Sequence, residues 1–205
     1  MSGRTLVLHD DRGQPLPFEP SRWHRPASPA EREFLARLVG PVLDVGCGPG
    51  RVLDVLARRR VAVLGVDPSP GAVALARRRG GAVLQRSVFD PIPGTGRWET
   101  VLLLDGNIGI GGDPRRLLRR CAELVRPGGA VVIEVEPPGT GWRSCQARLE
   151  RDGEASPWFN WAVVGCDRVG ELAAAAVLAV RQVIQVEHRW IASLARAGTE
   201  SRVCA

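Results

Sequence analysis

The chain has 205 residues, which is enough for one α/β domain with a sizeable core and too few for two domains of ordinary size. Hydrophobic residues make up 44% and charged residues 24%, a balance that excludes a largely disordered chain. The formal net charge is +6, but every basic residue is Arg and none is Lys, which favours a bias in composition over a dedicated nucleic-acid face. The absence of Lys also excludes a Schiff base through a side-chain amine.

The N-terminal region is rich in proline and poorly periodic. Short apolar runs at residues 5–8 and 16–18 flank the turn-like Asp11-Arg12-Gly13, which predicts a small hairpin or a loose arm. A helix is expected from Ser28-Pro29-Ala30-Glu31, because Ser is a favoured N-cap and Pro suits the first helical position. Gly40-Pro41 ends this helix.

From Pro41 onward, apolar strands alternate with capped helices, the pattern of a parallel sheet with helices on both faces. The predicted strands are residues 42–45, 62–66, 82–88, 100–104 and 130–136. The predicted helices are residues 51–60, 70–79 and 114–125.

The C-terminal part combines strands and a short helix. Residues 145–150 and 158–164 predict an inserted hairpin. Asp167 is expected to cap a helix that runs to about Ala176. Residues 178–187 and 189–195 predict a closing antiparallel pair, and the remaining residues predict a frayed tail.

The cysteines predict neither a disulfide framework nor a zinc site, because their number is odd and they never form C-x-x-C. His9 with the two following acids is a poor metal cluster, since adjacent residues in a strand point to opposite faces. No metal is therefore expected. The N-terminus lacks a signal-peptide apolar core, and residues 172–180 are too few to span a bilayer, so we expect a cytoplasmic protein without membrane partners.

Three closely spaced glycines follow the first predicted strand of the sheet, in Asp44-Val45-Gly46-Cys47-Gly48-Pro49-Gly50. Glycine allows the backbone to turn sharply and to approach a ligand, so this loop predicts a nucleotide site. Its G-x-G-x-G spacing differs from the dinucleotide G-x-G-x-x-G. Asp44 stands two residues before the first glycine and suits a cationic ligand better than a pyrophosphate.

These features resemble the class I methyltransferases that use S-adenosylmethionine, because the loop from Asp44 to Gly50 matches the first motif of that family. The resemblance covers roughly residues 41–195. It implies an α/β, Rossmann-like sheet of seven mostly parallel strands with an antiparallel C-terminal strand pair. The implied organisation is an arm and covering helix at 1–40, the methyltransferase domain at 41–197 with an insert at about 144–164, and a tail at 198–205.

The resemblance implies S-adenosylmethionine as cofactor and S-adenosylhomocysteine as product. Asp67 would accept hydrogen bonds from the ribose hydroxyls, and Asp90 from the adenine amine, with Val88 or Phe89 beside the ring. An alternative in which Asp90 only starts a turn stays open. The cofactor-binding residues so predicted are Asp44, Gly46, Cys47, Gly48, Gly50, Asp67, Pro68, Val88, Phe89, Asp90, Asp105 and Gly106.

The acceptor site is expected beside Asp105-Gly106-Asn107, after the fourth strand of the predicted sheet. Asp105 and His24 are the predicted catalytic residues if the acceptor must lose a proton. Alternatives stay open for both: Asp105 could orient the cofactor, and His24 could face solvent. The predicted acceptor-binding residues are Trp23, Asn107, Trp142 and Trp158, although Trp142 and Trp158 could equally pack the hairpin onto the sheet.

The expected function is therefore methyl transfer to a small-molecule acceptor by in-line displacement. The Asn/Asp-Pro-Pro-aromatic motif of enzymes that methylate nucleobase or amide nitrogens is absent, which disfavours a nucleic-acid substrate. The alternatives are a cofactor-binding protein that transfers no methyl group, such as a repurposed cyclase or regulatory subunit, and an RNA methyltransferase. A homodimer is compatible with this interpretation, and the sequence leaves the acceptor open.

Overall fold

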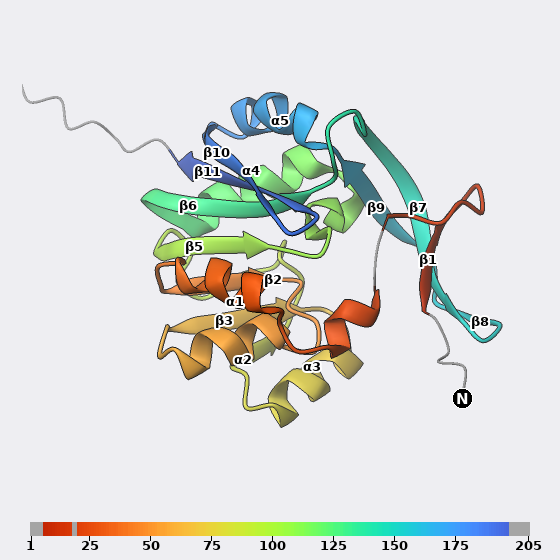
Figure 1. The fold of residues 1–205 in the computed structure, drawn as a ribbon, viewed down its shortest axis with the longest axis horizontal. Coiled ribbons are helices and arrows are strands. Elements are labelled where there is room, and N and C mark those ends of the chain that lie inside the picture. The colour runs from red at the N-terminus through yellow and green to blue at the C-terminus, as the bar shows by residue number, and fades with distance from the viewer. Residues whose placement is uncertain (1–5, 18–19, 197–205) are drawn as a thin grey trace, which may run out of the picture.

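A seven-stranded sheet forms the centre of the molecule, in the strand order β10-β11-β6-β5-β2-β3-β4 (Figure 1). The structure, a computed structural model, describes residues 6–17 and 20–196. Neighbouring strands are parallel except for the two pairs that involve β11. The predicted Rossmann-like sheet and its antiparallel C-terminal pair are confirmed. Its strands are β2 (Val42–Val45), β3 (Val63–Asp67), β4 (Val83–Gln85), β5 (Trp98–Leu103), β6 (Val125–Val135), β10 (Leu178–Val186) and β11 (Arg189–Arg196).

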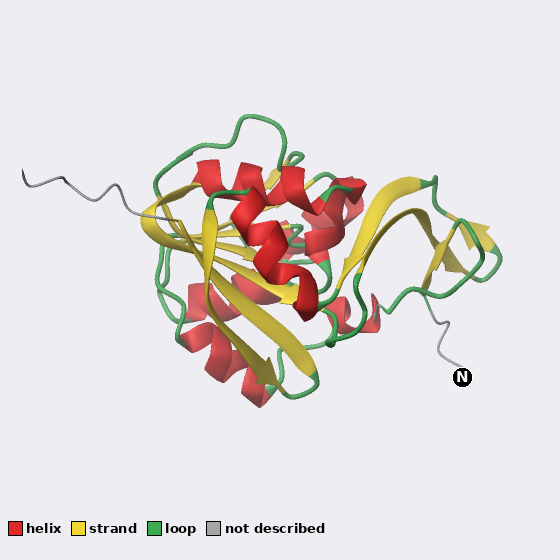
Figure 2. Ribbon diagram, turned by 90° about the horizontal axis from the view of Figure 1, so that it is seen from above, coloured by secondary structure: helices red, strands yellow, loops and turns green. Residues whose placement is uncertain are grey.

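Helices cover both faces of this sheet (Figures 1 and 2). The α-helices are α1 (Pro29–Ala36), α2 (Arg51–Arg58), α3 (Pro70–Arg78), α4 (Pro114–Leu124) and α5 (Val169–Ala175). Short 3-10 helices are η1 (Pro20–His24), η2 (Asn107–Gly112) and η3 (Cys166–Arg168).

The core divides into two layers because consecutive residues of a strand point to opposite faces. Leu102 of β5 belongs to a buried cluster with Leu35 of α1 and Leu56 of α2. Leu103, the next residue, belongs to the larger cluster that contains Leu118 of α4. The sheet is thus buried on both faces, which explains why its strands are nearly continuous apolar runs.

Three helices begin where their capping residues predict. The side chains of Ser28, Ser69 and Asp113 each accept a hydrogen bond from a backbone N–H of the first turn, and proline follows each of them. Helix α2 has no side-chain cap: its N-cap residue is Gly50, whose φ of 84° is a left-handed conformation that favours glycine.

A second, smaller sheet projects to one side of the main sheet (Figure 2). Its long strand β7 (Trp142–Arg151) pairs antiparallel with β1 (Val7–Asp10), β8 (Glu154–Ala155) and β9 (Phe159–Val164). The predicted insert is therefore a sheet joined by the N-terminal arm. Leu8 and Leu16 of the arm pack with residues of β7 and β9, so the arm contributes to the core of this sheet.

Several details of the predicted elements were wrong. The strand expected to reach residue 88 ends at Gln85, because Ser87 and Asp90 form a turn. Asp167 does not cap α5; its carboxylate instead accepts hydrogen bonds from Gly139 N at 3.2 Å and Gly141 N at 3.4 Å. Strand β6 begins at residue 125, directly after α4. The predicted tail at 198–205 lies outside the described residues.

No helix in the described part of the chain combines the length and the apolar character needed to cross a membrane.

Leu103 is fully buried in the two-layer core, so truncation of its side chain should strongly reduce the stability of the fold. We expect Leu103→Ala to lower the free energy of unfolding by about 2–5 kcal/mol, because it leaves a cavity between β5 and α4. Val180→Ala is the control, since Val180 is 41% exposed and should change stability by less than about 1 kcal/mol. Denaturant unfolding measures both, and equal losses would contradict the assigned core.

Candidate active site

The glycine-rich loop leaves the carboxyl end of β2 with three glycines in left-handed conformations, at φ values of 71° (Gly46), 53° (Gly48) and 84° (Gly50). Asn107 anchors this loop: its Nδ2 donates to Val45 O at 2.8 Å and to Gly46 O at 2.9 Å. A Cβ on Gly46 would lie 2.6 Å from Asn107 Nδ2. The first glycine is therefore required by the close approach of Asn107, which was predicted to bind the acceptor.

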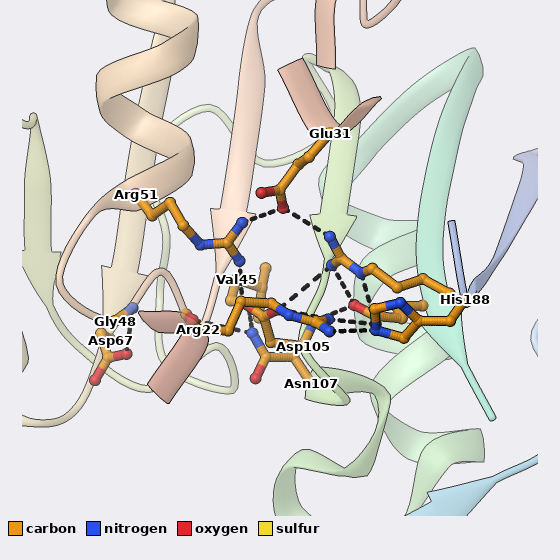
Figure 3. A network of polar contacts seen from close by, with 12 residues as sticks. Arg22, Glu31, Val45, Gly48, Arg51, Asp67, Asp105, Asn107 and His188 are labelled. Atoms are coloured by element: carbon orange, nitrogen blue, oxygen red, sulfur yellow. Dashed lines mark hydrogen bonds and ion pairs between the residues drawn. The ribbon is translucent and has the colours of Figure 1, made fainter. Parts of the chain in front are cut away.

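Asp67 lies beside the same loop, as predicted, at the end of β3 (Figure 3). Its Oδ2 accepts from Gly48 N at 2.9 Å, and its Oδ1 accepts from Ser69 N at 2.8 Å. Burial raises the pKa of Asp67, while these two N–H groups oppose the rise. Pro68 is exposed beside it.

Two buried polar atoms beside the glycine-rich loop have no hydrogen-bond partner. Among the described residues, Asp44 Oδ2 and Arg51 Nε make no hydrogen bond. Both residues line a small hollow of about 20 Å³ between the glycine-rich loop and Trp23 of η1. Burial raises the pKa of Asp44 to about 7, and the nearby charge of Asp105 adds to the rise. Buried polar groups normally have partners, so this hollow is a candidate ligand site.

A partly buried network of three guanidinium and three carboxylate groups lies next to this hollow (Figure 3). Its members are Arg22, Glu31, Arg51, Asp105, Glu134 and Arg189. They come from η1, α1, α2, the loop after β5, β6 and β11, so the network joins the N-terminal segment to the edge of the sheet.

Arg189 contacts all three carboxylates of this network. Its guanidinium donates to Glu134 Oε1 at 2.8 Å and Oε2 at 2.5 Å, to Glu31 Oε1 at 2.7 Å and to Asp105 Oδ1 at 3.3 Å. Arg51 pairs with the other oxygen of Asp105 and with Glu31. The predicted base Asp105 is thus held between two guanidinium groups, whose charges oppose the rise in pKa that burial causes.

A second hollow of about 280 Å³ lies on the other side of Asp105. Gly106, Glu136 and His188 contribute to its wall, together with several network residues. Arg22 NH2 lies 2.7 Å from His188 Nε2. Burial raises the pKa of Glu136 to about 7, and the neighbouring Glu134 adds to this effect. The hollow is therefore polar and charged rather than aromatic.

The predicted adenine-binding residues follow β4. Val88 is buried in the main core, so its side chain packs the fold. The ring of Phe89 lies under the guanidinium of Arg116, 4.3 Å from its centroid. Asp90 is exposed, and its Oδ2 accepts from Ser87 N at 3.2 Å, so it closes a turn that begins at Ser87 and does not start one. The side chain of Cys47 packs in the core between α2 and α3, so only its backbone belongs to the loop.

The structure does not bring the remaining predicted residues to either hollow. Trp142 packs on the core near α4, with Arg115 over its ring at 4.7 Å. Trp158 is 46% exposed and lies just before β9. His24 is exposed and lines a separate hollow of about 620 Å³. Of the rings in the smaller sheet, Trp161 lines a narrow space beside Gly106.

Sequence reasoning missed most of the charged network. Glu134 within β6 and Glu136 directly after it follow the apolar residues 130–133, and this is the clearest signal in the sequence. Arg51 is a weaker signal: a cation at a helix N-terminus opposes the macrodipole. Glu31 was interpreted only as a capping residue.

In residues 6–17 and 20–196, no group of three or more His, Cys, Asp or Glu side chains is placed to hold a metal ion.

Comparisons with known proteins agree with this geometry. A family model described as a methyltransferase domain matches residues 21–165. The trans-aconitate 2-methyltransferase of Methylobacterium nodulans is 37% identical over 137 residues, covering 61% of this chain and 49% of that protein. The ubiquinone biosynthesis O-methyltransferase of Alkalilimnicola ehrlichii is 27% identical over 147 residues, covering 62% of this chain and 59% of that protein.

A solved structure is similar in fold. The S-adenosylmethionine-dependent methyltransferase of Bacteroides fragilis, in complex with S-adenosylhomocysteine, matches with a TM-score of 0.77 and 22% identity. The match covers 96% of this chain and 89% of that one.

A Rossmann-like sheet with a glycine-rich loop and an acidic residue after its next strand defines the class I methyltransferase fold. Because the family model matches most of its length, the chain belongs to the methyltransferase domain family, as the sequence predicted. The chain spans only about half the length of the curated relatives that it matches.

The anchoring role of Asn107 predicts that Asn107→Asp destabilises the fold. A carboxylate would face two carbonyl oxygens in place of the amide N–H groups, which should cost about 1–3 kcal/mol of unfolding free energy. Asn160→Asp is the matched control, because Asn160 uses its Oδ1 as an acceptor from Gln146 and an aspartate keeps that oxygen. Denaturant unfolding compares the two, and equal effects would mean that Asn107 does not anchor the loop.

The raised pKa of Asp44 predicts how the stability of the fold depends on pH. Its pKa of about 7 in the folded chain exceeds its ordinary value of 3.8, so the folded state keeps a proton that the unfolded chain releases. Stability should therefore fall as pH rises from about 4 to about 7, and then level off. Glu136 contributes in the same direction.

We expect Asp44→Asn to make this decline shallower and to stabilise the ligand-free protein at pH 8 by about 1–4 kcal/mol. The measurement is denaturant unfolding at several pH values, with the exposed Asp11→Asn as control. Identical slopes for Asp44→Asn and the unaltered chain would contradict a buried, uncompensated Asp44.

Proposed function

We propose that the chain is an S-adenosylmethionine-dependent methyltransferase that acts on a small-molecule acceptor. The observation that carries the proposal is the pair of unpartnered buried atoms beside the glycine-rich loop, the acceptor Asp44 Oδ2 and the donor Arg51 Nε. The amino-acid end of S-adenosylmethionine carries an ammonium and a carboxylate group, which complement this pair. The chemistry of the site therefore fits the cofactor.

The other predicted cofactor residues extend the same site. Asp67 has carboxylate lone pairs beyond those used by Gly48 and Ser69, and these can accept from ribose hydroxyls. Gly46, Gly48 and Gly50 keep the loop backbone free of Cβ atoms. Phe89 and Asp90 lie after β4, where the adenine would extend. When bound, the cofactor supplies a methyl group on a positively charged sulfur.

The covering segment η1 must move outward to admit the cofactor. The hollow beneath Trp23 measures about 20 Å³, whereas ligand pockets span about 300–1,000 Å³. Arg22 of η1 contacts Asp105 and Glu134 at 3.9 and 3.5 Å and is partly exposed, whereas Arg189 is buried. Opening of η1 would leave the buried part of the network intact.

The acceptor would occupy the 280 Å³ hollow beyond Asp105. Its size suits a small molecule, and the curated relatives are named for small-molecule methylation. The chain's contribution is to hold the acceptor in line and to exclude water. The ion pairs of Asp105 with Arg51 and Arg189 would hold the wall of this hollow in place. His24 lines a different hollow and is therefore placed less favourably for proton transfer.

Two measurements test this function. Calorimetry should show binding of S-adenosylmethionine, and extracts of the source cells incubated with methyl-labelled cofactor should release S-adenosylhomocysteine and a labelled small product. Binding without turnover would favour a cofactor-binding protein, and labelled RNA with steeply salt-dependent binding would favour an RNA methyltransferase. Cytoplasmic localisation and a homodimer without nucleic-acid or membrane partners belong to the same proposal.

Asp67→Asn tests the ribose contact. The change removes a charged acceptor and should weaken binding of S-adenosylmethionine about 10- to 100-fold, because hydrogen bonds to charged groups contribute about 1.5–3 kcal/mol. Asp54→Asn, on the exposed side of α2, should bind like the unaltered chain. Calorimetric titration measures both affinities. Unchanged binding by Asp67→Asn would mean that Asp67 does not contact the ribose.

A further inference from the structure

Glu136 stands at the end of β6 with its backbone held on both sides. Its N–H donates to Val164 O at 2.8 Å, and its carbonyl accepts from Cys166 N at 2.9 Å. These bonds fix the direction in which the side chain leaves the strand. The half-buried side chain lines the 280 Å³ hollow and the narrow space beside Trp161.

Glu136 differs from the other carboxylates of this hollow in having no partner. Both oxygens of Glu134 accept from Arg189, and both oxygens of Asp105 pair with arginines. Within the described part of the chain, no hydrogen bond or ion pair engages the Glu136 carboxylate. A partly buried carboxylate without a partner is costly, so it suits a ligand that supplies one.

The charges around Glu136 favour a basic ligand. The groups that face it are Glu134 on its own strand, Asp105 after β5, Arg22 on η1, and His188 and Arg189 at the start of β11. With a neutral His188, these groups and Glu136 carry three negative and two positive charges. The hollow thus has a negative balance that an ammonium group would neutralise.

We propose that Glu136 binds the amino group of an amine acceptor and takes the proton that this nitrogen loses on methylation. The inference rests on the proposed function and names the substrate class of the same site. Asp105 lines both hollows, which places an acceptor at Glu136 next to the cofactor side of the site.

The proposed step is balanced. An ammonium acceptor would first give one proton to the Glu136 carboxylate, which frees the lone pair on nitrogen. The neutral nitrogen would then bond to the methyl carbon while the carbon–sulfur bond of the donor breaks and its electron pair stays on sulfur. The proton on Glu136 would pass to solvent. Burial and Glu134 raise the pKa of Glu136 to about 7, which matches a group that exchanges a proton near neutral pH.

The test begins with the labelled product from source-cell extracts. Mass spectrometry and NMR should place the new methyl group on nitrogen. With that acceptor, Glu136→Gln should lower kcat about 100-fold or more and abolish the acidic limb of the rate profile near pH 7. Glu154→Gln, an exposed change on β8, is the matched control and should behave like the unaltered enzyme.

A binding measurement separates contact from folding. Glu136→Gln should bind S-adenosylmethionine normally, yet bind the amine about 10- to 100-fold more weakly when S-adenosylhomocysteine is present. A methyl group on oxygen or carbon would overturn the inference while the proposed function stands. Nitrogen methylation with an unchanged rate profile in Glu136→Gln would overturn the role of Glu136. Failure to bind S-adenosylmethionine would overturn the proposed function itself.

Discussion

The partly buried ion network around Asp105 is the constraint on which the arrangement of the site depends. Glu31, Arg51 and Arg189 are buried and their three partners are partly buried, so the buried charges need this pairing. Loss of one partner from such a pair costs about 3–5 kcal/mol, although an apolar replacement of the whole group can be neutral. The network therefore determines position more than it adds stability: it holds η1 and α1 over the glycine-rich loop.

Asp105 also divides the site into two compartments. Its φ of 53° and that of 75° at the following Gly106 turn the chain sharply after β5. The hollow on one side contains Asp44 and the glycine-rich loop, and the hollow on the other contains Glu136. A donor and an acceptor on either side of this turn would meet at the carboxyl edge of the sheet, where ligands of open α/β sheets bind.

The smaller sheet closes the acceptor side through packing rather than through an aromatic cluster. Residues of a strand alternate between faces, so only some of the rings in this segment can reach the site. Trp161 reaches it because Gly109 of η2 leaves room: a Cβ on Gly109 would lie 2.7 Å from Trp161 Cε2. Trp158 lies before β9 and stacks with Arg148 instead. The sequence shows that these aromatic residues are close together in the chain, but not which face of the smaller sheet each ring occupies.

The sequence by itself determined the features that depend on neighbouring residues. Ser28, Ser69 and Asp113 mark helix starts through bonds made within one turn, and the glycine-rich loop followed by Asp67 indicates the family and its fold. Tertiary structure alone decided the charged network and the place of Glu136. Glu31 and Arg189 are 158 positions apart, and no local pattern links them. Their pairing follows from the insertion of β11 beside β6 and the docking of α1 above the sheet edge, because a buried charge is stable only where the completed fold brings it a partner.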